Sequence, residues 1–353
     1  MSMLGCRTRR PICAAPEEAD MKQCMLALLL GATISAQSAD TVESHVAAAK
    51  ALAASDPTAL INLCTPEQVA RATPQGRGGQ PPAGQKPAAQ QAPATPDRSR
   101  WAREPLKVFD NLYYVGEREY SSWAVTTSAG IIIIDPIYDY SVEEQVVGGL
   151  KKLGLDPTQI KYVVVSHAHR DHAGGAWYLQ ERFGARVLLT APDWEMLERN
   201  KQNWPKPKRD MMVTDGQQLT LGDTTLTFVH TFGHTPGTMS TIVPVKDNGK
   251  PHVAALWGGT GFNFTITPDR PAAHWFDAYI ASARRFREAA AKAGADVFLS
   301  NHPSWDGSND KMARLAARKA GEPHPYVLGA KSVQNYFTIA EHCARAGRLR
   351  AAQ

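Results

Sequence analysis

The sequence predicts an α/β fold in which strands alternate with helices from Trp101 onward. Two observations carry this prediction. Apolar runs of strand length recur along this part of the chain, and segments with helical spacing of apolar residues fall between them. With 353 residues, 43% of them hydrophobic and 21% charged, the chain is long and apolar enough to bury a core.

The expected strands follow from the positions of the apolar runs. Residues 112–115 and 123–126 are expected to form antiparallel strands. Ile131 to Ile134 is a run of four β-branched residues, which predicts a strand buried on both faces. The other expected strands are 162–165, 186–190, 225–230, 253–257 and 297–300.

Helical spacing is clearest in two places between these strands. Ser141 and Glu144 have the spacing of a capping box, which predicts that a helix begins there. One face of that helix would carry Val142, Val146, Val147, Leu150 and Leu153. A second, longer helix is expected over residues 275–293.

The N-terminal residues have the pattern of an export signal. Met21-Lys22 opens a short basic region, residues 24–34 are mostly apolar, and small residues follow at 35–39. This apolar run of 11 residues is too short to span a membrane, so we expect a signal peptide over 1–39, with 1–20 as an upstream extension. The protein is therefore expected to be periplasmic or secreted, with no membrane segment after cleavage.

The remainder divides into three parts. Residues 40–72 are expected to form a short helical segment, and the Pro/Gly/Gln-rich residues 73–100 a linker, ahead of the main domain over 101–353. Cys64 and Cys343 remain after cleavage, and the sequence leaves open whether they pair. The net charge of +5 is not gathered in a basic run, so no nucleic-acid partner is expected. The oligomeric state stays open.

The stretch richest in chemical information directly follows the strand expected at 162–165. It reads Ser166-His167-Ala168-His169-Arg170-Asp171-His172. Four candidate metal ligands thus lie at the carboxyl end of a strand, where the sites of α/β proteins gather. Imidazole and carboxylate bind zinc, and three protein ligands suffice when water takes the fourth position. We expect His167 and His169 to face one ion, and Asp171 and His172 a second.

Two further histidines follow later strands. His234 lies in a Gly-His-Thr-Pro-Gly turn after the strand at 225–230, and His302 precedes Pro303 after the strand at 297–300. Alone, each would more commonly be an ordinary loop residue, but both stand where a third ligand is needed. The other six histidines lack such a setting and are interpreted as structural: His45, His230, His252, His274, His324 and His342.

These motifs resemble the metallo-β-lactamase superfamily. The run that begins at Ser166 is similar to its central signature and the turn around His234 to its second, and the resemblance covers roughly residues 101–346. It implies an αβ/βα sandwich of two mixed sheets flanked by helices, with two zinc ions at one rim. It also implies the division of the ligands: the first zinc is bound by His167, His169 and His234, and the second by Asp171, His172 and His302.

Within the superfamily, the sequence most resembles the third subclass of zinc-dependent (class B) β-lactamases. Glyoxalase II and the lactonases usually carry an Asp that bridges the metals, whereas the equivalent strand here ends in Gly258-Gly259-Thr260. The third subclass takes the second zinc with Asp, His and His and has a small hydroxyl residue where Thr260 stands. It often has Asp-Ser where this chain has Gly259-Thr260, a difference that concerns substrate contacts rather than the metals.

The resemblance implies a hydrolase that opens the β-lactam ring of a small-molecule substrate. Two zinc ions would lower the pKa of bound water towards about 7, so that hydroxide can attack the lactam carbonyl. Asp171 is the expected catalytic residue, because it would bind metal and orient the hydroxide. Thr260, Asn263 and Tyr138 are candidate substrate contacts, and packing or a solvated loop explains each of them equally well.

Three alternatives stay open at this point. A zinc hydrolase could act on another cyclic ester or amide, such as a lactone, and an iron-dependent dioxygenase of the same fold could use the same ligand types. The third is a secreted binding module without catalysis, against which the complete set of six ligands argues. Ser308 and Lys311 match the S-x-x-K pattern of serine β-lactamases, but no K-T-G or S-D-N companion occurs, so chance explains the match.

Overall fold

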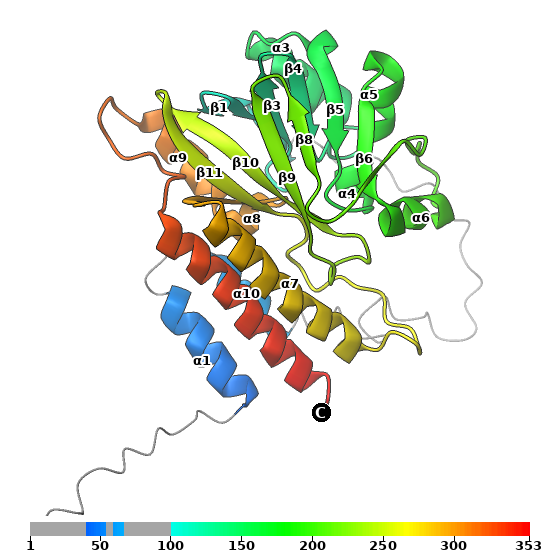
Figure 1. Cartoon of the computed structure of the whole chain (residues 1–353), viewed down its shortest axis with the longest axis vertical. Helices are drawn as coiled ribbons and strands as arrows, with labels where there is room; N and C mark the ends of the chain where they lie inside the picture. Colours follow the sequence, from blue (N-terminus) through cyan, green and yellow to red (C-terminus); the bar gives the residue numbers. More distant parts are fainter. Residues whose placement is uncertain (1–39, 54–58, 67–99) are drawn as a thin grey trace, which may run out of the picture. The chain divides into compact units, whose positions relative to one another are not determined.

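The computed structural model describes residues 40–53, 59–66 and 100–353. Two β-sheets pack face to face, and helices cover the outer face of each (Figure 1). This arrangement confirms the expected αβ/βα sandwich. The expected signal peptide, and the expected linker apart from Arg100, lie outside the described residues.

The first sheet contains seven strands in sequence order and is mixed. The strands are β1 (Leu106–Phe109), β2 (Leu112–Tyr114), β3 (Trp123–Thr127), β4 (Gly130–Ile134), β5 (Ile160–Val164), β6 (Arg186–Thr190) and β7 (Met211–Val213). β1 to β4 pair antiparallel, whereas β4 to β7 pair parallel. The carboxyl ends of these parallel strands therefore meet at one edge.

The second sheet has the order β12-β11-β10-β9-β8. Its strands are β8 (Gln218–Leu221), β9 (Thr224–His230), β10 (Met239–Asp247), β11 (Lys250–Trp257) and β12 (Val297–Ser300). Only β11 and β12 pair parallel. No strand is expected from the sequence at β10, which contains Pro244. Pro244 lies opposite Val253 of β11, but its carbonyl accepts the Asn111 side chain, so its nitrogen faces away from β11. On that side β9 pairs with β10 only as far as Ile242, so no ladder bond requires the missing N–H.

Side chains of the central strands alternate between two hydrophobic cores. Ile132 and Ile134 of β4 point into the core between the sheets, whereas Ile131 and Ile133 point to the core under the outer helices. All four are buried, because both faces of this strand are covered. Burial on both faces explains why the run of β-branched residues in the sequence is continuous.

The helices on the first sheet include the one predicted after Ser141. They are η4 (Val142–Val147), α3 (Gly148–Lys152), η5 (Pro157–Gln159), α4 (Arg170–Ala173), α5 (Ala176–Phe183) and α6 (Ala191–Arg199). The predicted apolar face packs on the sheet as expected. The predicted capping box is wrong. Ser141 has helical backbone angles and makes no side-chain cap bond, because the segment opens with a π-helical turn rather than an extended N-cap.

Long helices cover the second sheet. The remaining helices are α1 (Val42–Ala53), η1 (Ala59–Cys64), α7 (Ala272–Lys292), α8 (Pro303–Asp306), α9 (Ser308–Ala317) and α10 (Ala330–Arg350). No helix is expected from the sequence at α10, because its buried positions include many small or polar residues. Among the described residues, no helix is both long and apolar enough to cross a membrane.

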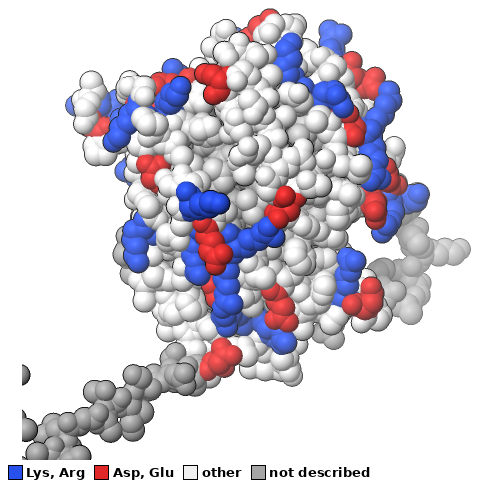
Figure 2. All heavy atoms as spheres, in the orientation of Figure 1, with Lys and Arg blue, Asp and Glu red and all other residues white. Residues whose placement is uncertain are grey.

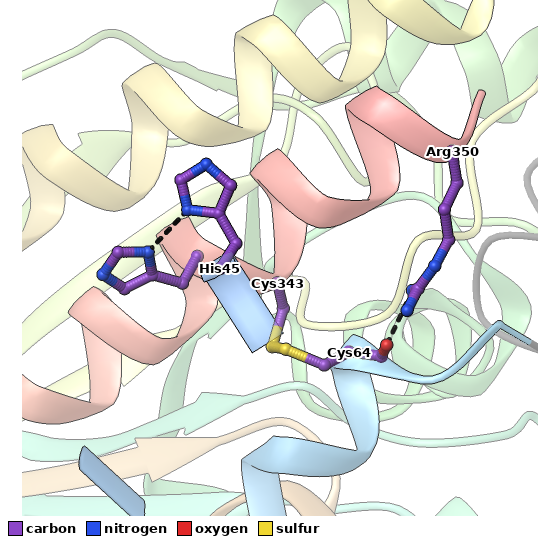
Figure 3. Close-up of a disulfide and its surroundings, with 5 residues drawn as sticks. His45, Cys64, Cys343 and Arg350 are labelled. Carbon is purple, nitrogen blue, oxygen red and sulfur yellow. Dashed lines mark hydrogen bonds between the residues drawn. A yellow bond between two sulfur atoms is a disulfide. The ribbon is translucent and has the colours of Figure 1, made fainter. Parts of the chain in front are cut away.

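A disulfide joins Cys64 to Cys343 and fastens the N-terminal helical segment to α10 (Figure 3). Ala49, Leu60 and Leu63 of this segment are fully buried in the core beneath α7 and α10. The segment is therefore part of the same compact unit as the sheets. The pairing that the sequence left open is present in the structure.

The outer face of α7 and α10 carries charges of both signs. Figure 2 shows Lys and Arg interleaved with Asp and Glu on this face. The nearly buried Glu341 of α10 accepts contacts from Arg284, Arg287 and Arg345. These pairs break up the positive charge, so this face has no broad patch of a single sign.

Candidate metal centre

Three histidines from two loops form the first group of candidate ligands. His167 and His169 follow β5, and His234 follows β9. The Nε2 atom of His234 lies 3.1 Å from both His167 Nε2 and His169 Nδ1. Ligands about 2.0–2.1 Å from one zinc ion would be separated by about this distance. The three nitrogens can therefore share one ion.

Asp171, His172 and His302 form the second group. The Nε2 atom of His172 lies 3.2 Å from both His302 Nε2 and Asp171 Oδ2, and Asp171 Oδ2 lies 3.6 Å from His302 Nε2. In each group all ligand atoms lie within 4.8 Å of one another. The structure thus brings together all six residues that the sequence singled out as metal ligands.

The local backbone explains how one short motif serves both groups. His169 has extended backbone angles and precedes α4, whereas Asp171 and His172 lie inside its single turn. The change from extended to helical backbone turns the second pair of side chains away from the first. Helix α8 repeats this arrangement, with His302 as its extended N-cap and Pro303 in its first turn.

Backbone carbonyls hold the histidine rings in place. The Nδ1 atom of His167 donates to the Gly258 carbonyl at 2.7 Å, that of His234 donates to Gly261, and that of His302 donates to Glu119 at 2.9 Å. These hydrogen bonds select the tautomer whose Nε2 lone pair faces the other ligands. Bonds of this kind orient the ligands of metal sites in general.

Asp135 supports the second group, although it lies outside the sequence motifs that indicate the ligands. Its Oδ2 lies 3.2 Å from His172 Nδ1, and its two carboxylate oxygens accept the Ser166 hydroxyl and backbone N–H, each at 2.7 Å. Asp135 is nearly fully buried and has a φ of 55°, a strained conformation for a residue other than glycine. In the sequence, only its position directly after β4, at the edge of the sheet that carries the ligands, indicates this role.

Electrostatics keeps most of the imidazoles neutral. Burial, followed by the neighbouring histidines, holds the pKa of His167 and of His234 well below the ordinary value. Burial also lowers the pKa of His302 to about 4. For His172, burial acts downward, but the carboxylates of Asp171 and Asp135 raise its pKa to about 10. The neutral imidazoles of His167, His234 and His302 can bind zinc directly, whereas His172 would release its proton to do so.

Comparison with known proteins places this centre in a family. The family model of the metallo-β-lactamase superfamily matches residues 115–247. A solved metallo-β-lactamase from Cronobacter sakazakii is 30% identical, with a TM-score of 0.56, over 72% of this chain and 93% of that one. The chain belongs to the metallo-β-lactamase superfamily. The subclass B3 metallo-β-lactamase BJP-1 of Bradyrhizobium japonicum has a TM-score of 0.60 and 28% identity, over 69% of this chain and 94% of that one.

Curated relatives in the superfamily include other hydrolases. The N-acyl homoserine lactonase AttM of Azorhizobium caulinodans is 33% identical over 121 residues, which are 30% of this chain and 44% of the lactonase. The match thus spans less than half of that relative's length. A hydroxyacylglutathione hydrolase of Acidiphilium cryptum is 28% identical over 66% of this chain and 90% of its own length. Membership of the superfamily therefore indicates a metallo-hydrolase but does not identify its substrate.

The two glycines at the end of β11 have no space for a side chain. A Cβ atom on Gly258 would lie 1.8 Å from the Met239 carbonyl oxygen, and one on Gly259 would lie 2.7 Å from His234 Cβ. Distances below 3.0 Å require the surroundings to shift. The two glycines therefore let the strand end pass directly beneath the first ligand group.

The expectation that Thr260 contacts substrate is not met by the structure. Its side chain is 1% exposed, and its hydroxyl forms a hydrogen bond with Ser300 at 3.0 Å. The Thr260 carbonyl in turn accepts the hydroxyl of Tyr279. Thr260 thus belongs to a buried polar network behind the metal centre, because the strand end turns its side chain inward. Sequence position alone does not give this direction.

Asn263 instead lines an open cavity of about 600 Å³ next to the first ligand group. His169 and His234 contribute to one wall of the cavity. Its other lining residues include Met196, Arg199, Thr265, Arg270 and Trp275. Asp269 adds a negative charge to the lining, and such a mixture of apolar walls with a few polar and charged groups is typical of a small-molecule site.

Tyr138 does not line this cavity and lies close to the second ligand group. It stacks on Tyr140 and meets Tyr120 edge to face, and the Tyr120 ring also contacts His302. Burial, followed by the negative charge of Asp171, raises the pKa of Tyr138. The Tyr138 hydroxyl therefore stays protonated and able to donate a hydrogen bond beside Asp171.

Asp193 links the two loops that carry the first group, although it too lies outside the sequence motifs that indicate the ligands. Its Oδ2 accepts Ala168 N–H at 2.8 Å and the Thr235 hydroxyl at 2.7 Å, and its Oδ1 accepts Gly237 N–H at 2.7 Å. Burial raises its pKa to about 6. Asp193 follows the strand β6 closely, so its place at the carboxyl edge of the sheet was again the available signal.

Proposed function

We propose that this protein is a zinc-dependent hydrolase that opens the β-lactam ring of antibiotics, with one zinc ion in each ligand group. The observation that carries the proposal is that both ligand groups are complete although β11 ends in glycines and not in a bridging Asp. The resemblance associates a bridging Asp with lactonases and glyoxalase II. Similarity to a subclass B3 β-lactamase supports the same choice.

The chemistry of this centre follows from its donor set. Zinc ions bound there would lower the pKa of water to about 7 and polarise the lactam carbonyl. Asp171 would bind in the second group and orient the attacking oxygen, while Asp135 holds the neighbouring His172. No serine nucleophile takes part, and Ser308 of the S-x-x-K match is fully buried.

The cavity offers contacts for a carboxylate-bearing substrate. Asn263 can donate a hydrogen bond, and Arg270 supplies a positive charge on the wall next to the first group. Trp275 and Met196 give apolar surface for the rest of the substrate. Tyr138, whose hydroxyl also forms a hydrogen bond with Tyr120, adds a polar group on the side of the second group.

A lactone hydrolase is the second candidate, because the lactonase AttM and its relatives match part of the chain. An iron-dependent dioxygenase is the third, and elemental analysis of the purified protein distinguishes it from both. We also propose that the protein is exported. The disulfide between Cys64 and Cys343 supports this, since disulfides persist in oxidising compartments.

A side-by-side assay tests the proposed substrate class. Purified, zinc-loaded protein is given a penicillin, a cephalosporin, a carbapenem and an acyl homoserine lactone, each with and without a chelator. We expect β-lactam turnover that the chelator abolishes, that added zinc restores, and that serine-acylating inhibitors leave unchanged. Brisk lactone hydrolysis without β-lactam turnover would refute the proposed substrate and leave the metal centre standing.

A further inference from the structure

A second pair of facing imidazoles lies outside the metal centre. His45 of α1 and His342 of α10 approach with their Nδ1 atoms 2.9 Å apart. Figure 3 shows the His45 ring joined by a dashed line to the other imidazole, close to the disulfide. Neither α1 nor α10 contributes a residue to the two ligand groups already described. No local pattern connects these two histidines, which are 297 positions apart in the chain.

Asp40 determines which nitrogen of His45 carries a proton when the ring is neutral. Its Oδ1 lies 2.6 Å from His45 Nε2, and a carboxylate oxygen can only accept a hydrogen bond there. The Nδ1 atom of neutral His45 therefore presents a lone pair towards His342. A carboxylate bound to the outer nitrogen of a histidine is the usual supporting arrangement for a metal ligand.

Without a metal, the Nδ1–H of His342 donates a hydrogen bond to this lone pair. A bound cation would replace the proton on His342 Nδ1, so that both Nδ1 atoms face it. The neighbour of His342 in the chain, Cys343, is fixed to Cys64 by the disulfide, which holds the N-terminal segment against α10. The separation of 2.9 Å is close to the 3.1 and 3.2 Å between histidine nitrogens in the two ligand groups.

We propose that His45 and His342 bind one additional divalent cation of the class that favours imidazole, with zinc as the representative ion. Two histidines would bind it and water would occupy the other positions, a smaller set of protein ligands than the three in each group of the metal centre. Asp40 would orient the first ligand. Glu341 does not supply a third ligand, because Arg284 and Arg287 hold its carboxylate. The bound cation would join α1 to α10 beside the disulfide.

Counting bound zinc tests this inference. Equilibrium dialysis against Zn²⁺, followed by elemental analysis, is applied to the full-length protein, to His342→Gln and to the control His274→Gln. His274 lies on α7 and belongs to no ligand group. We expect the parent and the control to bind one equivalent more than His342→Gln, with kcat/KM unchanged in both variants. Equal zinc content in all three proteins would overturn the proposal and leave the pair as a hydrogen bond.

The Asp40→Asn variant gives an independent test. Asp40 is largely exposed, so its replacement should not disturb folding. Loss of a supporting carboxylate typically weakens metal affinity by about 10–100-fold, and we expect that loss for the additional equivalent alone. An unchanged zinc titration in Asp40→Asn would contradict the role assigned to Asp40 and, with it, the orientation on which the site depends.

Discussion

Replacing Asp193 by Ala should weaken the metal centre from a distance. Asp193 does not belong to either ligand group, but its carboxylate holds the backbone of Ala168, between two ligands, and of Gly237, in the turn after His234. The approach is close: a Cβ on Gly237 would lie 2.6 Å from Asp193 Oδ1. Without the carboxylate, the two loops lose the group that joins them.

The size of the stability loss follows from the buried N–H donors that would lose their acceptor. Two backbone N–H groups, those of Ala168 and Gly237, would be left without a partner, and each such group costs about 1–3 kcal/mol. The Thr235 hydroxyl keeps a second contact with Thr238 and adds little. We therefore expect a loss of about 2–6 kcal/mol, a large part of the usual stability of about 5–15 kcal/mol.

Two measurements on the Asp193→Ala variant check this reasoning. Thermal unfolding of the chelated protein reports the stability loss, and competition with a chromophoric chelator should show zinc affinity reduced by about 10–100-fold. The control is Asp223→Ala, which removes a surface carboxylate that accepts one backbone N–H from Ser128 but touches no ligand loop. If Asp193→Ala kept the melting temperature and zinc affinity of the parent, the supporting role of Asp193 would be refuted.

Three further predictions concern the chemistry, the metal count and the disulfide. Asp171→Asn should reduce carbapenem turnover by about a hundredfold or more, because the charge that orients the attacking oxygen is lost, whereas Ser308→Ala should change it little; equal losses would contradict the mechanism. His302→Ala should leave the first ligand group filled and lower the zinc content of the centre by one ion, and elemental analysis that finds no loss would remove His302 from the ligand set. Cys343→Ser opens a loop of 279 residues closed by the bond to Cys64, and chain entropy sets the stabilisation at about 5 kcal/mol at most. The midpoint of urea unfolding should fall while kcat/KM is kept, and an unchanged midpoint would show that the bond contributes nothing to stability.

Local sequence patterns were sufficient to predict features that depend on residues close together in the chain. Ile131 to Ile134 predicted a strand buried on both faces, and the cores on each side of β4 confirm it. The motif from His167 to His172 identified candidate ligands, because four metal-binding side chains rarely fall within six positions by chance. These inferences rest on neighbours in the chain, whose relative positions the backbone restricts.

Other elements could not be recognised in this way. β10 contains Pro244, whose place is acceptable only because β9 stops pairing before it. The buried face of α10 contains Ala340, Ala344 and Gly347, which give a weak periodic signal. Thr260 has the residue type of a substrate contact, but the packing of the strand end turns its hydroxyl towards Ser300.

The sequence by itself determined the class of fold, the six candidate ligands and the superfamily that they resemble. Only the tertiary structure decided that Asp135 and Asp193 support those ligands and that Cys64 meets Cys343. It also decided that His45 faces a partner 297 positions away. The physical reason is the same in each case. These contacts join residues far apart in the chain, and their distance is fixed by how sheets and helices pack, which no local pattern records.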